Sequence, residues 1–350
     1  MSVESFIRAM PKVELHVHLE GAIRPETLRV IAEQNEIPET VKGYATWLDL
    51  VEHPDYERID ETIFTISQWL QAPEDLSLMA YELGVSLAKQ NVKYAEVQVN
   101  PIPYIEGGLA FDQFIAAIND GRDRAERGWD VRMAWILTMT RDNPRRSDDI
   151  LRWATGASAR KNGIVALGLS GPENAQPIGQ FERAFRNAEK KELPCVPHAG
   201  DTLGGEGVLE ILQVAHPYRL VDGWGSADAP DVLQLLVEQH IPLDVTIARQ
   251  LCLGHLENYA GYPLRQLYDE GVLLTINSDM PAFYKTTLND EYLAVFEHCD
   301  FAPEEIEELA LNAVRYSLLQ EDERKVMLDS FRTVYANLRV EHLVSEESTL

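Results

Sequence analysis

Eight short apolar runs recur along the chain, and longer amphipathic stretches separate them. The short runs have the length and period of β-strands, whereas the stretches between them repeat their apolar residues as amphipathic helices do. Regular alternation of strand and helix is typical of a parallel sheet covered by helices. The predicted strands span residues 13–18, 93–99, 131–139, 165–170, 195–200, 219–224, 242–247 and 272–277.

This pattern favours one fold over its main competitor. Eight strands with intervening helices predict an α/β fold of the (β/α)₈ type, the TIM barrel. A doubly wound open sheet would usually carry a glycine-rich phosphate loop after its first strand. The stretch LEGAIRPETL, residues 19–28, follows the first strand here and does not match that loop. We therefore expect one barrel domain over residues 1–350, a length that is ordinary for a barrel with insertions.

Two parts of the chain exceed what a plain barrel needs. The interval between the first two predicted strands, residues 19–92, is much longer than one helix requires. Within it, residues 44–70 carry aromatic side chains at helical spacing, which predicts extra helices over one end of the barrel. The chain is also predicted to be helical after residue 285, and residues 301–319 and 321–339 should support the outside of the barrel.

Composition narrows the classes of partner. A formal net charge of −26 opposes binding to nucleic acids and to anionic membranes. No apolar run approaches the roughly 20 residues of a membrane-spanning helix, and the first residues, MSVESFIRAMPK, do not resemble a secretory signal. The cysteines, Cys195, Cys252 and Cys299, form no spacing motif. We expect a cytoplasmic protein with a small-molecule substrate; the oligomeric state cannot be read from the sequence.

Titratable side chains gather where predicted strands end. His16 and His18, in the stretch VELHVHLEG, lie two residues apart and therefore face the same side of their strand. His198 and Asp201 end the fifth strand in PHAGD, and Asp279 ends the eighth in NSDMP. The carboxyl ends of barrel strands meet at one rim, so these side chains should lie close together. Any one histidine could equally be a core residue, but three imidazoles with one carboxylate favour a Zn²⁺-type site.

These motifs resemble the adenosine deaminase branch of the amidohydrolase superfamily. KVELHVHLEG resembles its opening signature, and GLSGPE, PHAGD and NSDMP resemble, in order, its G-x-x-G-x-E, H-A-G-E and T-D-D-P motifs. By that resemblance, His16, His18, His198 and Asp279 would bind one zinc ion per chain. The metal would activate a water molecule, which would attack an amine-bearing carbon and release ammonia. Asp279 would also orient the water.

The catalytic positions depart from the family pattern. Asp201 stands where the family has a glutamate that shuttles a proton, and its side chain is one methylene shorter. The family motif R-[IL]-G-H-G corresponds here to RLVDG, which places Asp222 at the position of the catalytic histidine. An alignment with one gap would place Trp224 there instead. The predicted catalytic residues are therefore Asp201, Asp222 and Asp279, with Trp224 as the alternative at one position.

The positions that would meet the substrate also differ. Met280 replaces the second aspartate of T-D-D-P, which in the family hydrogen-bonds the purine ring, and methionine offers no useful hydrogen bond. TIARQ replaces the family's C-P-x-S-N, so Arg249 is either a solvated loop residue or a substrate contact. Gly171 would allow a planar base to approach the backbone. The predicted substrate contacts are Gly171, Met280 and Trp224.

Three functions are compatible with these residues. The first is a zinc-dependent deaminase of a purine-like or other heterocyclic amine, with plain adenosine disfavoured by the altered pocket. The second is a metal hydrolase of the same fold that acts on an amide, lactone or phosphoester, which Met280 favours over strict adenosine chemistry. The third is a non-catalytic metal-binding protein, against which Asp201 and Asp222 argue because both can carry protons.

Overall fold

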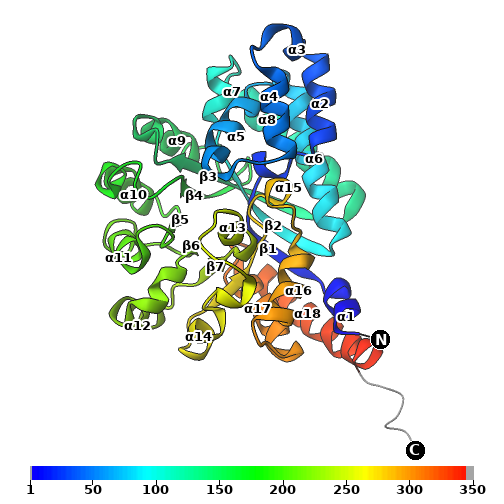
Figure 1. The fold of residues 1–350 in the computed structure, drawn as a ribbon, viewed down its shortest axis with the longest axis vertical. Helices are drawn as coiled ribbons and strands as arrows, with labels where there is room; N and C mark the ends of the chain where they lie inside the picture. Colours follow the sequence, from blue (N-terminus) through cyan, green and yellow to red (C-terminus); the bar gives the residue numbers. More distant parts are fainter. Residues whose placement is uncertain (1, 344–350) are drawn as a thin grey trace, which may run out of the picture.

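The computed structural model of the chain describes residues 2–343 and is built around an eight-stranded sheet (Figure 1). Each strand pairs in parallel with the next strand along the chain. The two ends of the sheet meet where Val17 forms a parallel bridge with Asp279. Asn277 strengthens this closure because its Oδ1 accepts hydrogen bonds from the backbone N–H groups of Leu15 (2.9 Å) and His16 (3.0 Å). The predicted (β/α)₈ barrel is confirmed.

The last three strands are shorter than the sequence predicts. Three residues form each of β6, β7 and β8. The chain leaves β6 at Gly223, whose φ of 69° is left-handed, and α13 begins at Ile247 directly after β7, so part of each apolar run is buried outside the sheet. The strands are β1 (Lys12–His18), β2 (Val92–Val99), β3 (Arg132–Thr140), β4 (Ile164–Ser170), β5 (Cys195–Ala199), β6 (Leu220–Asp222), β7 (Leu243–Val245) and β8 (Leu274–Ile276).

A ring of helices surrounds the barrel, as Figure 1 shows. These helices bury an apolar stripe, which in α8 includes Phe114, Ile118 and Ala125. The helices that follow β1 to β8 in the ring are α6 (Pro73–Lys89), α8 (Phe111–Trp129), α9 (Ser147–Ala154), α10 (Glu182–Glu189), α11 (Gly204–Val214), α12 (Pro230–Glu238), α14 (Leu264–Asp269) and α17 (Pro303–Arg315).

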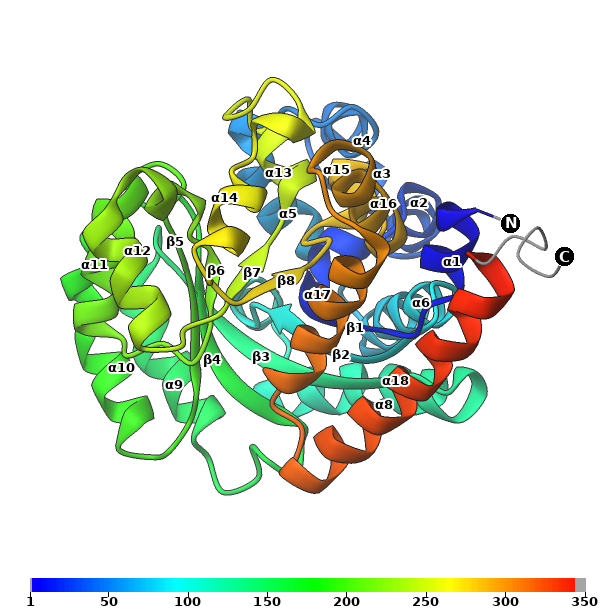
Figure 2. The ribbon, with the colours of Figure 1, turned by 90° about the horizontal axis from the view of Figure 1, so that it is seen from below.

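The long interval after β1 forms four extra helices, as predicted. Figure 2 shows α4 and α5 at the same end of the barrel as α13 and α15, which follow β7 and β8, so the helical insertion lies at the carboxyl ends of the strands. Its aromatic side chains pack within it and onto α15: the ring centroids of Tyr44 and Trp69 are 5.3 Å apart, and those of Tyr56 and Tyr284 are 6.0 Å apart. The helices named here are α2 (Pro25–Gln34), α3 (Ile37–Thr40), α4 (Tyr44–Glu52), α5 (Ile59–Ser67), α13 (Ile247–Cys252) and α15 (Pro281–Tyr284).

The carboxyl-terminal helices support the outside of the barrel, as expected. α16 (Leu288–His298) and α17 lead into α18 (Glu321–His342), which packs against α1 (Val3–Ala9) and α17 (Figure 2). The Tyr335 hydroxyl donates a hydrogen bond to the carbonyl oxygen of Pro11 (2.7 Å), which ties α18 to the start of β1. No helix within residues 2–343 has both the length and the apolar content of a membrane span. The remaining helix at the strand ends is α7 (Ile102–Glu106).

A buried ion-pair network crosses the barrel interior. Arg219, at the start of β6, contacts Glu96 of β2 (2.6 Å) and Asp244 of β7 (2.9 Å), and all three side chains are fully buried. Its Nη1 also donates to the backbone carbonyl oxygen of Tyr316 (2.8 Å). Because Arg219 is the first residue of RLVDG, it holds the strand that carries Asp222.

Replacing Arg219 with methionine is expected to lower the free energy of unfolding by about 3–5 kcal/mol, because Glu96 and Asp244 would remain buried without a counter-ion. Urea denaturation of both proteins measures the difference. Arg183→Met is the matched control, since the Arg183 side chain is 77% exposed and should contribute less than about 1 kcal/mol. Equal unfolding free energies for the Arg219 variant and the control would show that the buried network does not stabilise the barrel.

Candidate active site

The residues predicted at the ends of β1 and β8 meet in one place. His16 and His18 point from β1 toward Asp279, whose Oδ1 lies 3.5 Å and 3.6 Å from their respective Nε2 atoms. The backbone fixes this arrangement, because the N–H of His18 donates to the carbonyl oxygen of Asp279 (2.7 Å) and the N–H of Asp279 donates to that of His16 (3.1 Å). Asp279 has a left-handed φ of 59°, which turns its side chain back over the end of β1.

This group fits a metal ion. The Oδ1 of Asp279 is buried and has no hydrogen-bond partner, although buried polar atoms normally have one. Burial lowers the pKa of His18 to about 3, so its imidazole is neutral, which is the form that binds metals. The Nε2 of Gln98 lies 3.3 Å from the Nδ1 of His16 and orients that ring. Two imidazoles and a carboxylate suit zinc and similar divalent ions.

His198 lies in a second group beside the first. Its Nε2 is 2.9 Å from Asp201 Oδ2 and 3.1 Å from Asp222 Oδ2, and ligand atoms of these three residues lie within 4.8 Å of one another. The Nδ1 of His198 is buried without a hydrogen-bond partner. The four predicted metal ligands are therefore divided between two groups: three residues share the first, and His198 contacts the two aspartates.

Arg249 connects the two groups. Its guanidinium makes ion pairs with Asp222 Oδ2 (Nη1, 2.9 Å), Asp279 Oδ2 (Nε, 3.3 Å) and Asp201. The Arg249 side chain is 16% exposed and lines the cavity, so Arg249 is not a solvated loop residue. Burial opposes its charge, but the surrounding carboxylates outweigh that effect and raise the pKa of Arg249 well above its usual value.

The structure also places the two alternatives for the catalytic histidine. Asp222 lies against His198, and both of its carboxylate oxygens are engaged, because the Thr246 hydroxyl donates to Oδ1 (2.6 Å). Trp224 packs instead against Tyr262 and His255, with ring centroids 6.1 Å and 6.5 Å away, and it is not among the residues that line the cavity. Of these two residues, Asp222 is the one brought to the metal-ligating side chains.

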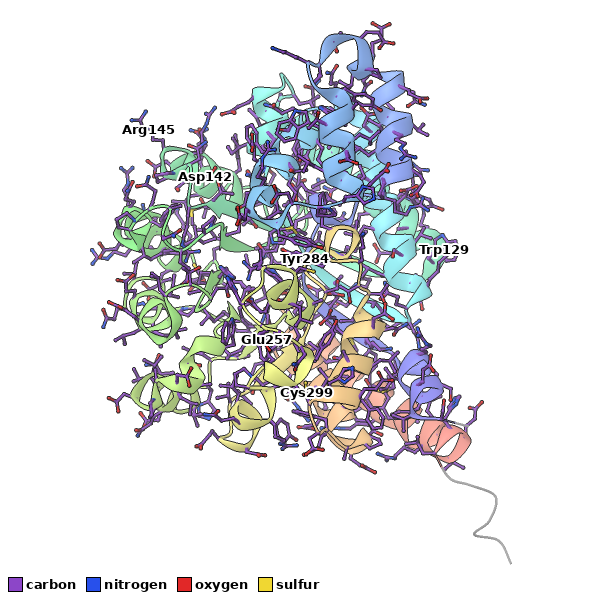
Figure 3. All side chains as sticks on the ribbon, in the orientation of Figure 1. Trp129, Asp142, Arg145, Glu257, Tyr284 and Cys299 are labelled. Atoms are coloured by element: carbon purple, nitrogen blue, oxygen red, sulfur yellow. The ribbon has the colours of Figure 1, made fainter. Side chains whose placement is uncertain are left out.

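A cavity of about 300 Å³ opens onto both groups. Gly171 and Met280, the predicted substrate contacts, line it. In Figure 3, Tyr284, another lining residue, lies near the middle of the barrel, and Asp142 lies toward α9. The helical insertion contributes the apolar side chains of Ile59, Ile63 and Phe64. The cavity therefore has apolar groups from the insertion and polar groups from the strand ends, which is typical of a small-molecule site.

Four further carboxylates line the cavity and were not singled out from the sequence: Glu20, Glu57, Asp60 and Asp142. Glu20 is buried, its Oε1 accepts a hydrogen bond from the N–H of Asn100 (3.0 Å), and burial raises its pKa to about 7. The sequence did contain a signal for Asp142, because this residue lies shortly after the end of a predicted strand, where active-site residues of barrels are found. No signal existed for Asp60, because its position depends on how the helical insertion packs over the barrel.

Glu173 holds the loop that carries Asp201. Its carboxylate accepts hydrogen bonds from four successive backbone N–H groups, at distances of 2.7–3.1 Å. The Nη2 of Arg141 donates to the carbonyl oxygen of His198 (2.6 Å), and its Nη1 donates to that of Gly171 (3.1 Å). Glu173 is the last residue of the GLSGPE motif, so the sequence identified it as part of the site. The four hydrogen bonds that it accepts could be seen only in the structure. The donors are Gly200, Asp201, Thr202 and Leu203.

Glu173→Gln is expected to lower the free energy of unfolding by about 1–3 kcal/mol, because the amide nitrogen cannot accept the hydrogen bonds of the oxygen it replaces. The turnover should also fall, by up to ~100-fold if Asp201 moves by about 1 Å. Urea denaturation and steady-state kinetics measure the two effects. Glu182→Gln, at a partly exposed ion pair of α10, is the control. Wild-type stability and turnover in the Glu173 variant would show that the loop is held by other contacts.

Comparison with known sequences gives a consistent result. A family model described as adenosine deaminase matches residues 11–334. The aminodeoxyfutalosine deaminase of Streptomyces avermitilis is 31% identical over 318 residues, which cover 91% of this chain and 89% of that protein. An adenosine deaminase of Clostridium botulinum is 28% identical over 340 residues, with coverage of 94% and 99%.

Solved structures with this fold are also similar. The adenine deaminase of Arthrobacter aurescens has a TM-score of 0.84 and 25% identity, and the match covers 93% of this chain and 99% of that one. An amidohydrolase of Burkholderia ambifaria, solved with bound zinc, has a TM-score of 0.88 and 23% identity, with coverage of 97% and 94%. The resemblance inferred from the strand-end motifs is confirmed.

Proposed function

Because the chain belongs to the adenosine deaminase family, we propose that it is a zinc-dependent enzyme that deaminates a purine-like or other heterocyclic amine. One observation carries this proposal. The side chains of His16 and His18 both approach Oδ1 of Asp279, a buried carboxylate oxygen that has no hydrogen-bond partner. These residues line the cavity, so a substrate can reach them. The products would be ammonia and the corresponding carbonyl compound.

His16, His18, His198 and Asp279 are the proposed ligands of one zinc ion per chain. Bound zinc lowers the pKa of a coordinated water molecule toward neutrality and so supplies a nucleophile. Zinc is favoured by the nitrogen and oxygen ligand set and by the zinc found in a structural neighbour. Asp279, which contacts His16 and His18, would also orient the attacking water.

Asp201 is the proposed proton carrier. Its Oδ1 accepts a hydrogen bond from Gln250 Nε2 (3.2 Å), and its Oδ2 contacts His198 and Arg249. The backbone N–H of Asp201 donates a hydrogen bond to the Glu173 carboxylate (2.9 Å). Contacts at the backbone and at the carboxylate therefore both hold the side chain of Asp201 in place. A carboxylate held this way can pass the proton of the attacking water to the ring or to the leaving amine. Asp222 is a positioning residue, because Asp201 lines the cavity whereas Asp222 does not, and the carboxylate of Asp222 contacts Thr246, His198 and Arg249.

The substrate would lie between Gly171 and Met280. Adenosine and adenine, after which two of the similar proteins are named, share a 6-aminopurine ring. Met280 lines the cavity where the family motif has an aspartate, and its side chain cannot hydrogen-bond a ring nitrogen. We therefore propose that the enzyme recognises its substrate mainly by shape, with fewer hydrogen bonds to the ring than adenosine would receive in the family pocket.

The presence of Met280 at this position also supports the second candidate, a metal hydrolase that cleaves an amide, lactone or phosphoester. The negative net charge opposes nucleic-acid and anionic-membrane partners and so supports a small-molecule substrate, and a cytoplasmic location is part of the proposal.

Measurement of ammonia release on a panel of aminopurines, pterins and aminopyrimidines, together with metal content, tests the proposal. We expect close to one zinc per chain and ammonia from at least one compound, with no release after chelation. A full metal site without ammonia from any compound would favour the second candidate. A full metal site that cleaves none of these bonds would favour a non-catalytic metal-binding protein, and a chain that binds no metal would contradict the proposal.

A further inference from the structure

One charged side chain interrupts the apolar wall that α5 presents to the cavity. Ile63 and Phe64 line the cavity, and Asp60, three and four residues before them, lines it on the same face of the helix. Within residues 2–343, the Asp60 carboxylate makes no hydrogen bond or ion pair. An ionised group in an apolar wall without a protein partner indicates that its partner is a ligand.

Asp142 lines the same cavity from the end of β3. In the part of the chain that the structure describes, it too has no ion-pair partner. The side chain of Asp60 is exposed, but the surrounding walls partly desolvate its carboxylate, which raises its pKa. The charge of Arg249 lowers this pKa and the charge of Asp142 raises it, so Asp60 and Asp142 are close enough to repel each other.

The cavity stays negatively charged even with a metal ion in place. Arg249 is the one lysine or arginine among the described lining residues, and it is already paired with three aspartates. Arg249 and one zinc ion would contribute three positive charges. The lining carboxylates outnumber these charges even if Glu20 is neutral, as its pKa of about 7 allows. They are Glu20, Glu57, Asp60, Asp142, Glu173, Asp201 and Asp279.

Two tyrosine rings line the cavity together with these carboxylates. The planes of Tyr56 and Tyr284 are inclined by 37° to each other, and the Tyr56 hydroxyl is held by the carbonyl oxygen of Phe283 (3.3 Å). Burial raises the pKa of Tyr284, and the charge of Asp60 raises it further, so this ring lies within reach of that carboxylate. The faces of aromatic rings attract cations, and the rings therefore favour the same kind of ligand as the acids do.

We propose that the substrate carries a positive charge, such as an ammonium group, away from its reacting ring, and that Asp60 and Asp142 bind this group. A ligand that fills the cavity removes water from both carboxylates, which is costly unless the ligand compensates for it. A hydroxyl group could donate one hydrogen bond, but only a cation also offsets the repulsion between the two acids. The inference rests on the proposed deaminase function and adds the charge of the substrate.

The test compares three substrates that differ in charge. The ring that gives the most ammonia in the panel of aminopurines, pterins and aminopyrimidines is prepared with an aminoethyl, a hydroxyethyl or a carboxymethyl side chain, which for adenine is attached at N9. Ammonia release by the zinc-loaded full chain gives kcat/KM for each compound. We expect the cationic compound to exceed the neutral one by ~10-fold and the anionic one by ~100-fold at low ionic strength. Added salt should reduce both ratios.

Two variants assign the preference to residues. Asp60→Asn and Asp142→Asn remove a charge at nearly constant size, and each should lower kcat/KM of the cationic compound by ~10-fold while changing the neutral compound by less than about 2-fold. Asp148→Asn is the matched control, because this side chain of α9 is 58% exposed and does not line the cavity. Thermal unfolding checks that each variant is folded.

The outcomes separate this inference from the proposed function. Ammonia release without a preference for the cationic compound would overturn the inference and leave the deaminase proposal standing. An equal loss for all three compounds in the folded Asp60 and Asp142 variants would also overturn it. If neither variant folds, the comparison of the three compounds on the wild type still decides. No ammonia from any ring would overturn the proposed function and the inference together.

Discussion

Asp279→Asn is expected to abolish retention of zinc and to reduce ammonia release by more than about 100-fold. The loss should exceed the 10–100-fold effect that is typical of residues that only support a metal ligand. The variant removes the negative charge of a buried oxygen that faces His16 and His18 and has no hydrogen-bond donor. Metal analysis after desalting and an ammonia assay at saturating substrate measure both effects.

The local backbone makes this a clean substitution. Asp279 has a φ of 59°, and asparagine adopts the left-handed conformation as readily as aspartate does. Asp300→Asn is the matched control, because Asp300 also has a left-handed φ (65°) but is exposed and does not line the cavity. A variant at Asp279 that kept one zinc through desalting would show that this carboxylate is not a ligand.

The barrel and the first metal group could be predicted because both follow from local periodicity. A period of two residues places His16 and His18 on one side of β1 wherever that strand lies. The alternation of strands and helices restricts the fold to few topologies, and the carboxyl ends of the strands must then meet. Asp279 and His198 were predicted from their positions at strand ends, and the approach of Asp279 to β1 depends on the closure of the barrel.

The lengths of the last strands could not be predicted in the same way. Apolar runs at residues 219–224 and 242–247 are buried throughout most of their length, but only three residues of each join the sheet. The strand ends at Asp222 because the chain turns there with a left-handed φ of 65°, followed by Gly223 with 69°. A run of apolar residues predicts that a segment is buried. It does not predict the residue at which that segment stops pairing with the neighbouring strand.

The role of Arg249 was also beyond the sequence. Its partners lie 27, 30 and 48 residues away along the chain, so no local spacing connects them. An arginine after a strand is normally solvated, and its engagement here depends on α13 starting directly at the end of β7. The same holds for Asp60, which reaches the cavity only because α5 lies over the barrel. The sequence therefore predicts where the site lies, whereas tertiary packing determines which charged side chains contact one another there.

Asp201→Asn is expected to reduce ammonia release by about 100–10,000-fold while one zinc remains bound, since this is the range that one general acid–base group contributes. Asparagine is nearly isosteric with aspartate but cannot accept and return a proton. It would also place an amide or a neutral oxygen against Arg249 and His198 in place of a carboxylate. Steady-state kinetics should show the loss in kcat, with KM changed much less, because the cavity walls are unaltered.

The pH dependence separates proton transfer from a purely structural role. If Asp201 carries the proton, Asp201→Asn should remove one limb of the pH profile of kcat, whereas a residue that only positions its neighbours would lower the whole profile. Asp201→Glu restores the carboxylate on a side chain one methylene longer and should recover part of the lost rate. A wild-type kcat in Asp201→Asn would exclude this residue as the proton carrier. Because Asp222 does not line the cavity and Glu20 does, Glu20 would then be the next carboxylate to test.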